Sequence, residues 1–154
     1  KSSFALFLID LDKGKPVNDT YGHAIGDDVL RTIAHRLRKS VREMDTVARL
    51  GGDEFVIVLR SVSSQRDVET VALKINEAAA QSIKVLGVPI EIGASIGIAL
   101  YESGLNTLGD LLRRADAAMY EGKKAGGGSY RFFGGKPVAP VNPVIKPDQG
   151  NLAA

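Results

Sequence analysis

The sequence predicts an α+β fold on the ferredoxin-like or palm-type plan: an antiparallel-rich sheet with a βαββαβ core, plus an added helix and a short strand. Three observations lead to this prediction. Phe4–Leu11 is an almost continuous apolar run, which is typical of a central strand buried on both faces. Thr46–Leu50 and Glu54–Leu59 indicate two short strands joined by a tight, glycine-rich turn. Apolar residues at helical spacing follow both the first strand and the hairpin.

The helices and the later strands follow from the same periodicity. The first helix is expected to begin near Asn18, with apolar residues every three or four positions as far as Leu37. The elements predicted after the hairpin are a helix over 66–82, a strand over 90–100, a helix from residue 107 and a short strand over 129–133. Thr107 is suited to cap the third helix, because Asp110 follows it by three residues.

The chain is expected to contain one domain and a tail. Its 154 residues are enough for a single hydrophobic core without help from disulfides. The predicted helices and strands fall within residues 1–133. Prolines punctuate residues 134–154, which show neither helical nor strand periodicity, so we interpret that segment as a linker or disordered tail.

The composition favours a cytoplasmic domain, either by itself or as the cytosolic part of a larger, membrane-anchored protein. Hydrophobic residues make up 44% and charged residues 25%, and there is no cysteine. The apolar run Phe4–Ile9 is too short to span a bilayer and no signal peptide is recognisable, so no direct membrane contact is expected. A net charge of +2 is too small to indicate nucleic acid binding.

Acidic residues gather where the first strand and the hairpin turn are expected to meet. Asp10 and Asp12 end the first strand, and Asp53 and Glu54 follow the hairpin glycines. Carboxylates clustered without a basic partner repel one another, so a divalent cation is a natural companion, and oxygen ligands favour Mg²⁺ or Mn²⁺ over zinc. The alternative, that these acids are simply solvated at strand ends, stays open at this point.

A polar stripe marks the start of the first helix. Asn18, Gly22 and Gly26 recur every four residues, and a second row one position later ends at Asp27. Glycine weakens a helix interior by about 1 kcal/mol relative to alanine, so two of them suggest that something flat approaches the backbone. Asn18 and Asp27 are then suited to the edge of a base. Alternatively, the glycines allow another strand to pack closely.

The hairpin turn is the most specific local signal. Gly51 and Gly52 permit positive φ angles and leave room above the backbone, where phosphate groups would fit beside the following acids. An ordinary hairpin has the same turn chemistry, so the turn alone does not decide between the two.

Taken together, these residues resemble the GGDEF family, the diguanylate cyclases. The resemblance runs from about Phe4 to Phe133. It rests on five blocks in the family's order and spacing: Asp10-Leu11-Asp12, residues 17–27 from Val17-Asn18-Asp19 to Gly26-Asp27, Arg49 with Gly51-Gly52-Asp53-Glu54-Phe55, residues 95–99, and Arg114-Ala115-Asp116 with Met119-Tyr120.

The resemblance implies that two GTP molecules are joined into cyclic di-GMP with release of pyrophosphate. By resemblance, Asp10, the Leu11 carbonyl and Asp53 would hold two Mg²⁺ (or Mn²⁺) ions, and Glu54 would support them and assist removal of the ribose 3′-OH proton. One subunit would hold one GTP, so a homodimer is the expected catalytic unit.

The resemblance also assigns the nucleotide contacts. Asn18 and Asp27 would read guanine, and Lys123 would contact the terminal phosphates. Phosphates would also meet the backbone N–H groups of the loop after the first strand, from Lys13, Gly14 and Lys15.

Arg42 and Asp45 match the family's R-x-x-D inhibitory site in their spacing from Gly51. By resemblance they would bind cyclic di-GMP as product and inhibitor, the arginine contacting a guanine. The alternative is an exposed ion pair at a helix end, worth under about 1 kcal/mol.

The sequence departs from the family pattern in three places. Gly14 stands where the family usually has an aromatic residue, and Gly127 stands where a phosphate-binding arginine is common. The family's opening helix is expected to lie outside the given sequence, which would leave Arg49 without its usual acidic partner. Two other functions therefore remain: a GTP-binding module that regulates an adjoining cyclic di-GMP phosphodiesterase domain, and a product receptor that acts only through Arg42 and Asp45.

Overall fold

The structure is a computed structural model that describes residues 3–101 and 107–135. The predicted tail, 134–154, lies outside the described residues except for its first two positions. In chain order the elements are β1 (Ala5–Leu11), α1 (Gly14–Tyr21), α2 (His23–Ser40), β2 (Thr46–Gly51), β3 (Glu54–Leu59), α3 (Gln65–Ala80), β4 (Ile83–Val85), β5 (Val88–Ile90), β6 (Ala94–Leu100), α4 (Leu108–Lys124) and β7 (Tyr130–Phe132).

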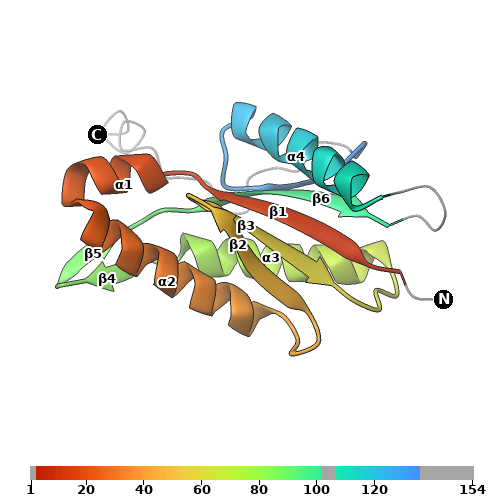
Figure 1. Ribbon diagram of the computed structural model, residues 1–154, viewed down its shortest axis with the longest axis horizontal. Coiled ribbons are helices and arrows are strands. Elements are labelled where there is room, and N and C mark those ends of the chain that lie inside the picture. The colour runs from red at the N-terminus through yellow and green to blue at the C-terminus, as the bar shows by residue number, and fades with distance from the viewer. Residues whose placement is uncertain (1–2, 102–106, 136–154) are drawn as a thin grey trace, which may run out of the picture.

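A five-stranded sheet carries the fold, in the order β2-β3-β1-β6-β7 (Figure 1). Strand β1 pairs antiparallel with β3 on one side and with β6 on the other, and β7 adds to β6 in parallel. The first four strands in this order have the ferredoxin-like arrangement, so the predicted α+β fold is confirmed. Strands β4 and β5 form a separate two-stranded ribbon.

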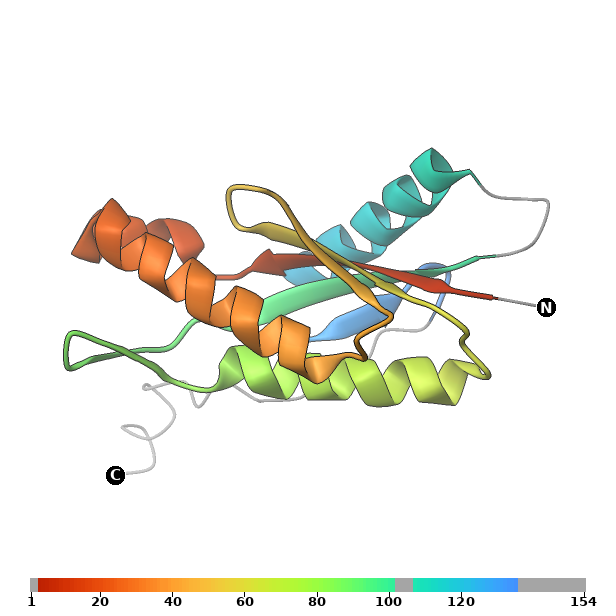
Figure 2. The same cartoon turned by 60° about the horizontal axis from the view of Figure 1, so that its bottom comes forward.

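Helices cover both faces of the sheet (Figure 2). Successive side chains of a strand point to opposite faces, and β1 is buried on both. Phe7 and Ile9 pack in the core on the side of α2 and α3, while Leu6 and Leu8 pack on the side of α4. In the described ranges no helix is long and apolar enough to cross a bilayer.

Three predicted boundaries are wrong, and the first is that the chain becomes helical at Gly14 rather than near Asn18. The predicted single first helix is two helices, because the backbone at Gly22 has φ 88° and breaks the helical path between α1 and α2. The predicted strand 90–100 begins only at Ala94, because Ile90 belongs to β5 of the separate ribbon. Gly93, just before β6, is hydrogen-bonded outside the sheet: its N–H donates to the Ala79 carbonyl (3.3 Å), and its carbonyl accepts from the Asp12 N–H (3.1 Å). Strands β4 and β5 were not predicted, since three residues are too few to show a period.

The ends of α4 are well defined. Thr107 and Asp110 form the predicted capping box, with the Asp110 N–H 3.1 Å from the Thr107 hydroxyl and the Thr107 N–H 3.1 Å from the Asp110 carboxylate. The other end of α4 carries Lys123 and lies against the end of β1 where Asp10 and Asp12 are found.

The close packing of α4 on β6 depends on Gly97. A Cβ atom at this position would lie 1.8 Å from the Ala115 carbonyl oxygen and 2.6 Å from the Met119 nitrogen, both of the α4 backbone. Gly97→Ala is therefore expected to lower the free energy of unfolding by about 1–3 kcal/mol, because the helix has to move off the sheet. Urea unfolding measures this change.

Gly122→Ala is the matched control for that measurement. Gly122 is also buried and lies within α4, but the nearest atom to its added Cβ would be the Ser129 hydroxyl, at 3.7 Å. Alanine at this helical position is expected to be neutral or to stabilise by up to about 1 kcal/mol. Equal destabilisation by the two variants would contradict the close approach assigned to Gly97.

Candidate functional site

The acidic residues of β1 and of the hairpin lie at one edge of the sheet. Asp10 is the register partner of Glu54 in the β1–β3 pair, and the Leu11 N–H donates to the Asp53 carbonyl at 3.1 Å. The expectation that the hairpin pairs beside the first strand, and so brings its turn to Asp10, is confirmed. The pairing of β1 with β3 therefore brings together carboxylates that lie more than 40 residues apart in the chain.

The hairpin turn itself has the geometry that its glycines allow. Gly51 and Gly52 both have positive φ angles, 148° and 52°. Arg49 closes the turn, since its Nε donates to the Gly52 carbonyl at 3.0 Å. Arg49, which was expected to lack its usual acidic partner, thus has a main-chain partner within the hairpin, at the turn that precedes Asp53.

The electrostatics of this edge favour a bound cation. Burial raises the pKa of the Asp53 carboxyl, and the neighbouring Asp10 carboxylate raises it further. The pKa of Glu54 is raised by burial first, then by Asp10 and Asp116. A carboxyl with a raised pKa contributes stability at low pH, and this contribution is lost as the pH rises through that pKa. The ionised carboxylates therefore destabilise this edge of the fold. A cation bound there would offset their repulsion.

Lys123 already supplies one positive charge. Its Nζ lies 3.0 Å from Asp10 Oδ2 and 3.6 Å from Asp12 Oδ1, between the two carboxylates. The lysine, assigned by resemblance to phosphate, therefore lies directly beside the residues assigned to the metal. A ligand that brings both a divalent cation and phosphate oxygens would exchange these contacts for equivalent ones.

Asp12 has a role that the sequence did not reveal. Its carboxylate accepts hydrogen bonds from the Ser95 hydroxyl (2.5 Å) and from the Gly128 N–H (2.9 Å). From the sequence, Asp12 was grouped with the acids expected to attract a cation. Only the pattern of two acids spaced by one residue marked it, because its partners lie 83 and 116 residues away in the chain.

A narrow crevice joins several of the assigned residues. Leu11, Gly14, Asn18 and Asp53 line a cavity of about 10 Å³ between α1, α2 and the hairpin. A Cβ at Gly14 would lie 2.1 Å from Asp53 Oδ2, and one at Gly26 would lie 1.7 Å from Asn18 Oδ1. Gly26 thus makes room for the side chain of Asn18, whereas a Cβ added at Gly22 would have no atom within 4 Å, so no strand atom is among the nearest neighbours of either glycine in the described residues.

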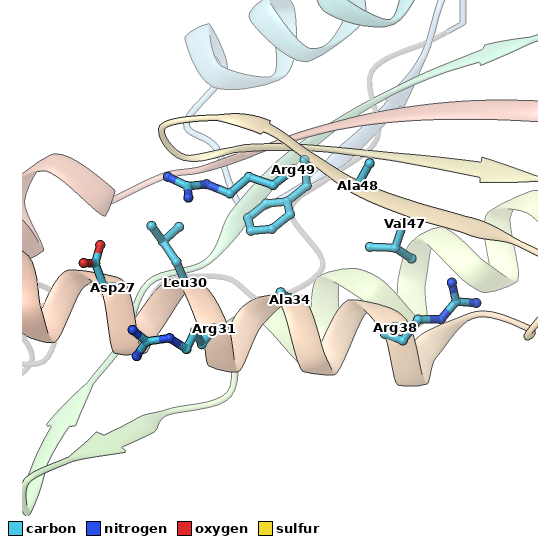
Figure 3. Close-up of a pocket in the computed structure, with 9 residues that line it drawn as sticks. Asp27, Leu30, Arg31, Ala34, Arg38, Val47, Ala48 and Arg49 are labelled. Carbon is cyan, nitrogen blue, oxygen red and sulfur yellow. The ribbon is translucent and has the colours of Figure 1, made fainter.

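A larger groove lies between α2 and β2 (Figure 3). Its volume is about 450 Å³, and charged side chains surround an apolar floor; it is lined by Asp27, Leu30, Arg31, Ala34, Arg38, Val47, Ala48, Arg49 and Phe55. Asp27 is exposed at this groove, whereas Asn18 lines the crevice. The structure therefore places the two residues assigned to guanine on different cavities. Of the phosphate-loop residues, Lys13 is exposed and Gly14 is buried.

Arg42 and Asp45 lie away from the acidic edge, between the end of α2 and the start of β2. The Asp45 side chain is only 1% exposed, while that of Arg42 is 52% exposed. Asp45 accepts hydrogen bonds from the Arg42 N–H (2.9 Å), Arg42 Nε (3.0 Å), Arg42 Nη2 (3.1 Å) and the Arg60 N–H (2.9 Å). The buried Asp45 carboxylate thus acts as a clasp: besides pairing with the half-exposed Arg42 it binds the main chain at Arg60, which an exposed helix-end ion pair alone would not do.

The donor set at the acidic edge fits magnesium better than zinc. In residues 3–101 and 107–135, no three His, Cys, Asp or Glu side chains are arranged to hold a metal ion by themselves. Magnesium is commonly bound by one or two carboxylates, with water and substrate phosphate completing its six ligands. Asp10 and Asp53 supply such a pair; burial is the main cause of the raised pKa of Asp53, and the Asp10 carboxylate adds to it.

Comparison with known proteins identifies the family. The sequence profile described as "Diguanylate cyclase, GGDEF domain" matches residues 1–129. The chain is 45% identical over 130 residues to the bifunctional diguanylate cyclase/cyclic di-GMP phosphodiesterase MucR of Pseudomonas aeruginosa, covering 84% of this chain and 19% of that protein. It is 42% identical over 133 residues to diguanylate cyclase TpbB of the same species, covering 86% of this chain and 31% of that protein. The chain thus spans less than a third of either relative.

Solved structures agree. The GGDEF domain of TpbB matches with a TM-score of 0.82 and 41% identity, covering 86% of this chain and 77% of that one. The GGDEF domain of DgcB from Caulobacter crescentus, solved in complex with c-di-GMP, matches with a TM-score of 0.79 and 27% identity, covering 86% and 79%. The fold and the acidic sheet edge define a palm-type α+β domain. The chain belongs to the diguanylate cyclase, GGDEF domain family.

Proposed function

We propose that this chain condenses two GTP molecules into cyclic di-GMP and two pyrophosphates, with Mg²⁺ or Mn²⁺ as cofactor. The observation that carries the proposal is the acidic edge, where the Gly51–Phe55 hairpin holds Asp53 and Glu54 against Asp10 and Lys123 lies alongside. This edge combines cation ligands with a phosphate-binding charge. Family membership supplies the class of reaction, and the relatives MucR and TpbB are themselves named diguanylate cyclases.

Each residue at the edge has a separate task in this proposal. Asp10, the Leu11 carbonyl and Asp53 would hold the metal, which when bound would neutralise charge on the triphosphate and activate the attacking oxygen. Glu54, whose pKa is raised by burial, is suited to take the proton from the ribose 3′-OH. Lys123 would leave Asp10 for the terminal phosphates and offset the charge of the departing pyrophosphate.

Guanine recognition is assigned to Asn18 and Asp27, on neighbouring helices α1 and α2. A carboxylate accepts two N–H bonds from guanine, and a carboxamide both donates and accepts. Since Asn18 fills the space over Gly26 in the ligand-free protein, its side chain would have to turn outward to meet a base. The backbone of Lys13, Gly14 and Lys15 would meet the phosphates.

Catalysis would require two copies of the domain, because each holds one GTP and the two 3′-oxygens attack across a two-fold axis. A homodimer, assembled through this or a neighbouring part of a longer cytoplasmic protein, is the proposed active unit. Product feedback would act through Arg42, whose half-exposed guanidinium is oriented by the buried Asp45 carboxylate and is suited to a guanine of cyclic di-GMP.

Two observations favour the second candidate, a GTP-binding module that regulates an adjoining phosphodiesterase domain. Gly127 brings no side chain to the turn after α4, and the crevice lined by Gly14 and Asn18 is narrow in the ligand-free protein. MucR, which is named as bifunctional, combines the two activities. A module of this kind would bind GTP with magnesium and release no product.

Base recognition can be tested by substitution of Asp27. Asp27→Asn is expected to weaken binding of a slowly hydrolysed GTP analogue by about tenfold, since one of the two guanine N–H groups would face an amide N–H. Titration calorimetry in the presence of Mg²⁺ measures the change, with an ATP analogue for comparison. Glu77→Gln is the control, because Glu77 is exposed on α3 and is not among the groove-lining residues. Equal affinity of the Asp27→Asn variant and the wild type would contradict the assignment.

A further inference from the structure

We infer that Asp12 is a positioning residue: its carboxylate latches the turn after α4 to the start of β6 and thereby holds Lys123 at the acidic edge. The inference rests on the proposed function, because it takes Lys123 to contact the terminal phosphates of GTP. Asp12 itself is not assigned to the metal or to the nucleotide.

The latch consists of hydrogen bonds between three segments that are distant in sequence. The Asp12 carboxylate accepts from the Ser95 hydroxyl at 2.5 Å and from the Gly128 N–H at 2.9 Å, while the Asp12 N–H donates to the Gly93 carbonyl at 3.1 Å. Ser95 is fully buried in β6, so one end of the latch is rigid. Hydrogen bonds to an ionised carboxylate are stronger than those between neutral groups.

Further main-chain hydrogen bonds connect this turn to the end of α4, which carries Lys123. The Gly127 N–H donates to the Gly122 carbonyl at 3.0 Å, and the Gly126 N–H donates to the Lys123 carbonyl at 3.1 Å. The turn is therefore bonded back onto the last residues of the helix. Fixing the Gly128 N–H on Asp12 consequently fixes the stretch of backbone from which the Lys123 side chain extends.

The hydrogen bonds of Asp12, rather than its charge, would help nucleotide binding. A second carboxylate beside Asp10 repels a triphosphate, so the charge by itself opposes binding. Lysine is a flexible chain whose ammonium is a point charge, and it can address phosphates only if its backbone is correctly placed. Because Gly127 has no side chain to offer the phosphates, their binding depends more strongly on the position of Lys123.

Two substitutions at Asp12 separate these effects. Asp12→Ala and Asp12→Asn both remove the charge, but asparagine keeps an acceptor for the Gly128 N–H and can donate to the Ser95 hydroxyl. With Mg²⁺ present, Asp12→Ala is expected to weaken binding of a GTP analogue by about tenfold and to leave GMP, which lacks the terminal phosphates, within about twofold. Asp12→Asn is expected to bind the GTP analogue at least about as tightly as the wild type does.

Several outcomes would overturn the inference. Equal losses of affinity for the GTP analogue in the alanine and asparagine variants would assign the effect to charge. Equal losses of affinity for the GTP analogue and for GMP would assign it to a general disturbance of the fold. If Asp12→Ala does not fold, Ser95→Ala removes one hydrogen bond of the latch while keeping the charge. It should weaken binding of the GTP analogue by about threefold and leave the affinity for GMP unchanged. No loss in Ser95→Ala would then count against the latch.

Hydrogen exchange of the Gly128 amide, followed by NMR without nucleotide, tests the latch independently of GTP. Protection of this amide should be lost in Asp12→Ala and kept in Asp12→Asn. If the wild type fails to bind the GTP analogue, the proposed function fails, yet this exchange pattern would still support the latch. Unchanged protection in both variants would overturn it even if GTP binds.

Discussion

Asp53→Asn is expected to lower the rate of cyclic di-GMP formation by at least about a hundredfold. Substituting residues that merely orient metal ligands typically costs 10–100-fold in metal affinity or activity, and Asp53 is proposed to be a ligand itself. Asparagine has nearly the same shape but no charge, so it retains the hairpin while removing half of the carboxylate pair. The rate is measured with GTP and Mg²⁺, with the product identified by mass.

The stability of the variant distinguishes a lost metal ligand from a damaged fold. Because burial and Asp10 raise the pKa of Asp53, its ionised form opposes folding when no cation is bound, and its neutral replacement is expected to be at least as stable. The melting temperature without Mg²⁺ should therefore be equal or higher, and Mg²⁺ should raise it less than it does in the wild type. A variant that keeps its turnover, or that loses it only by unfolding, would contradict the role of Asp53.

Asp45→Ala is expected to lower the free energy of unfolding by about 2–3 kcal/mol. The substitution removes an almost fully buried carboxylate and leaves the main-chain N–H groups of Arg42 and Arg60 without their acceptor. Arg42→Ala should cost only about 1 kcal/mol, because Arg42 is half exposed and the main-chain bonds to Asp45 remain. Urea unfolding at neutral pH measures both changes.

The pH dependence of the Asp45 contribution has a definite sign. Burial alone would raise the pKa of Asp45, but the hydrogen bonds from Arg42 and from the Arg60 N–H hold it below its ordinary value. A lowered pKa contributes stability that is present above the unfolded pKa, about 3.9, and is lost as the pH falls through the folded one. The gap between wild type and Asp45→Asn should be constant from about pH 5 to 7 and should shrink below about pH 4. A gap that widens in acid would contradict the clasp.

Local signals were enough to predict the elements that frame the site. The apolar run of β1, the glycines of the hairpin and the Thr107 cap are each specified by a few neighbouring residues, and each is confirmed in the structure. The meeting of Asp10 with the hairpin was expected on the condition that the hairpin pairs beside the first strand, and the pairing of β1 with β3 meets that condition.

The remaining features depend on contacts that no local pattern contains. The break at Gly22 lies within a continuous helical period, so the sequence predicted one helix where there are two. Asp12 bonds to residues 83 and 116 positions away, and the occupation of the space over Gly26 by Asn18 depends on how α1 folds back on α2. The same long-range packing placed Asp27 on the groove and Asn18 in the crevice.

The central claim, that the acidic edge of this domain turns GTP into cyclic di-GMP, is tested most directly by product analysis. The chain is incubated at high concentration with GTP, with and without Mg²⁺, and products are identified by mass, with a phosphodiesterase present to prevent the proposed product feedback. We expect magnesium-dependent cyclic di-GMP and its linear breakdown product, at a rate per chain that rises with protein concentration. Magnesium-dependent GTP binding without product would favour the regulatory module, and no GTP binding with magnesium would contradict the account.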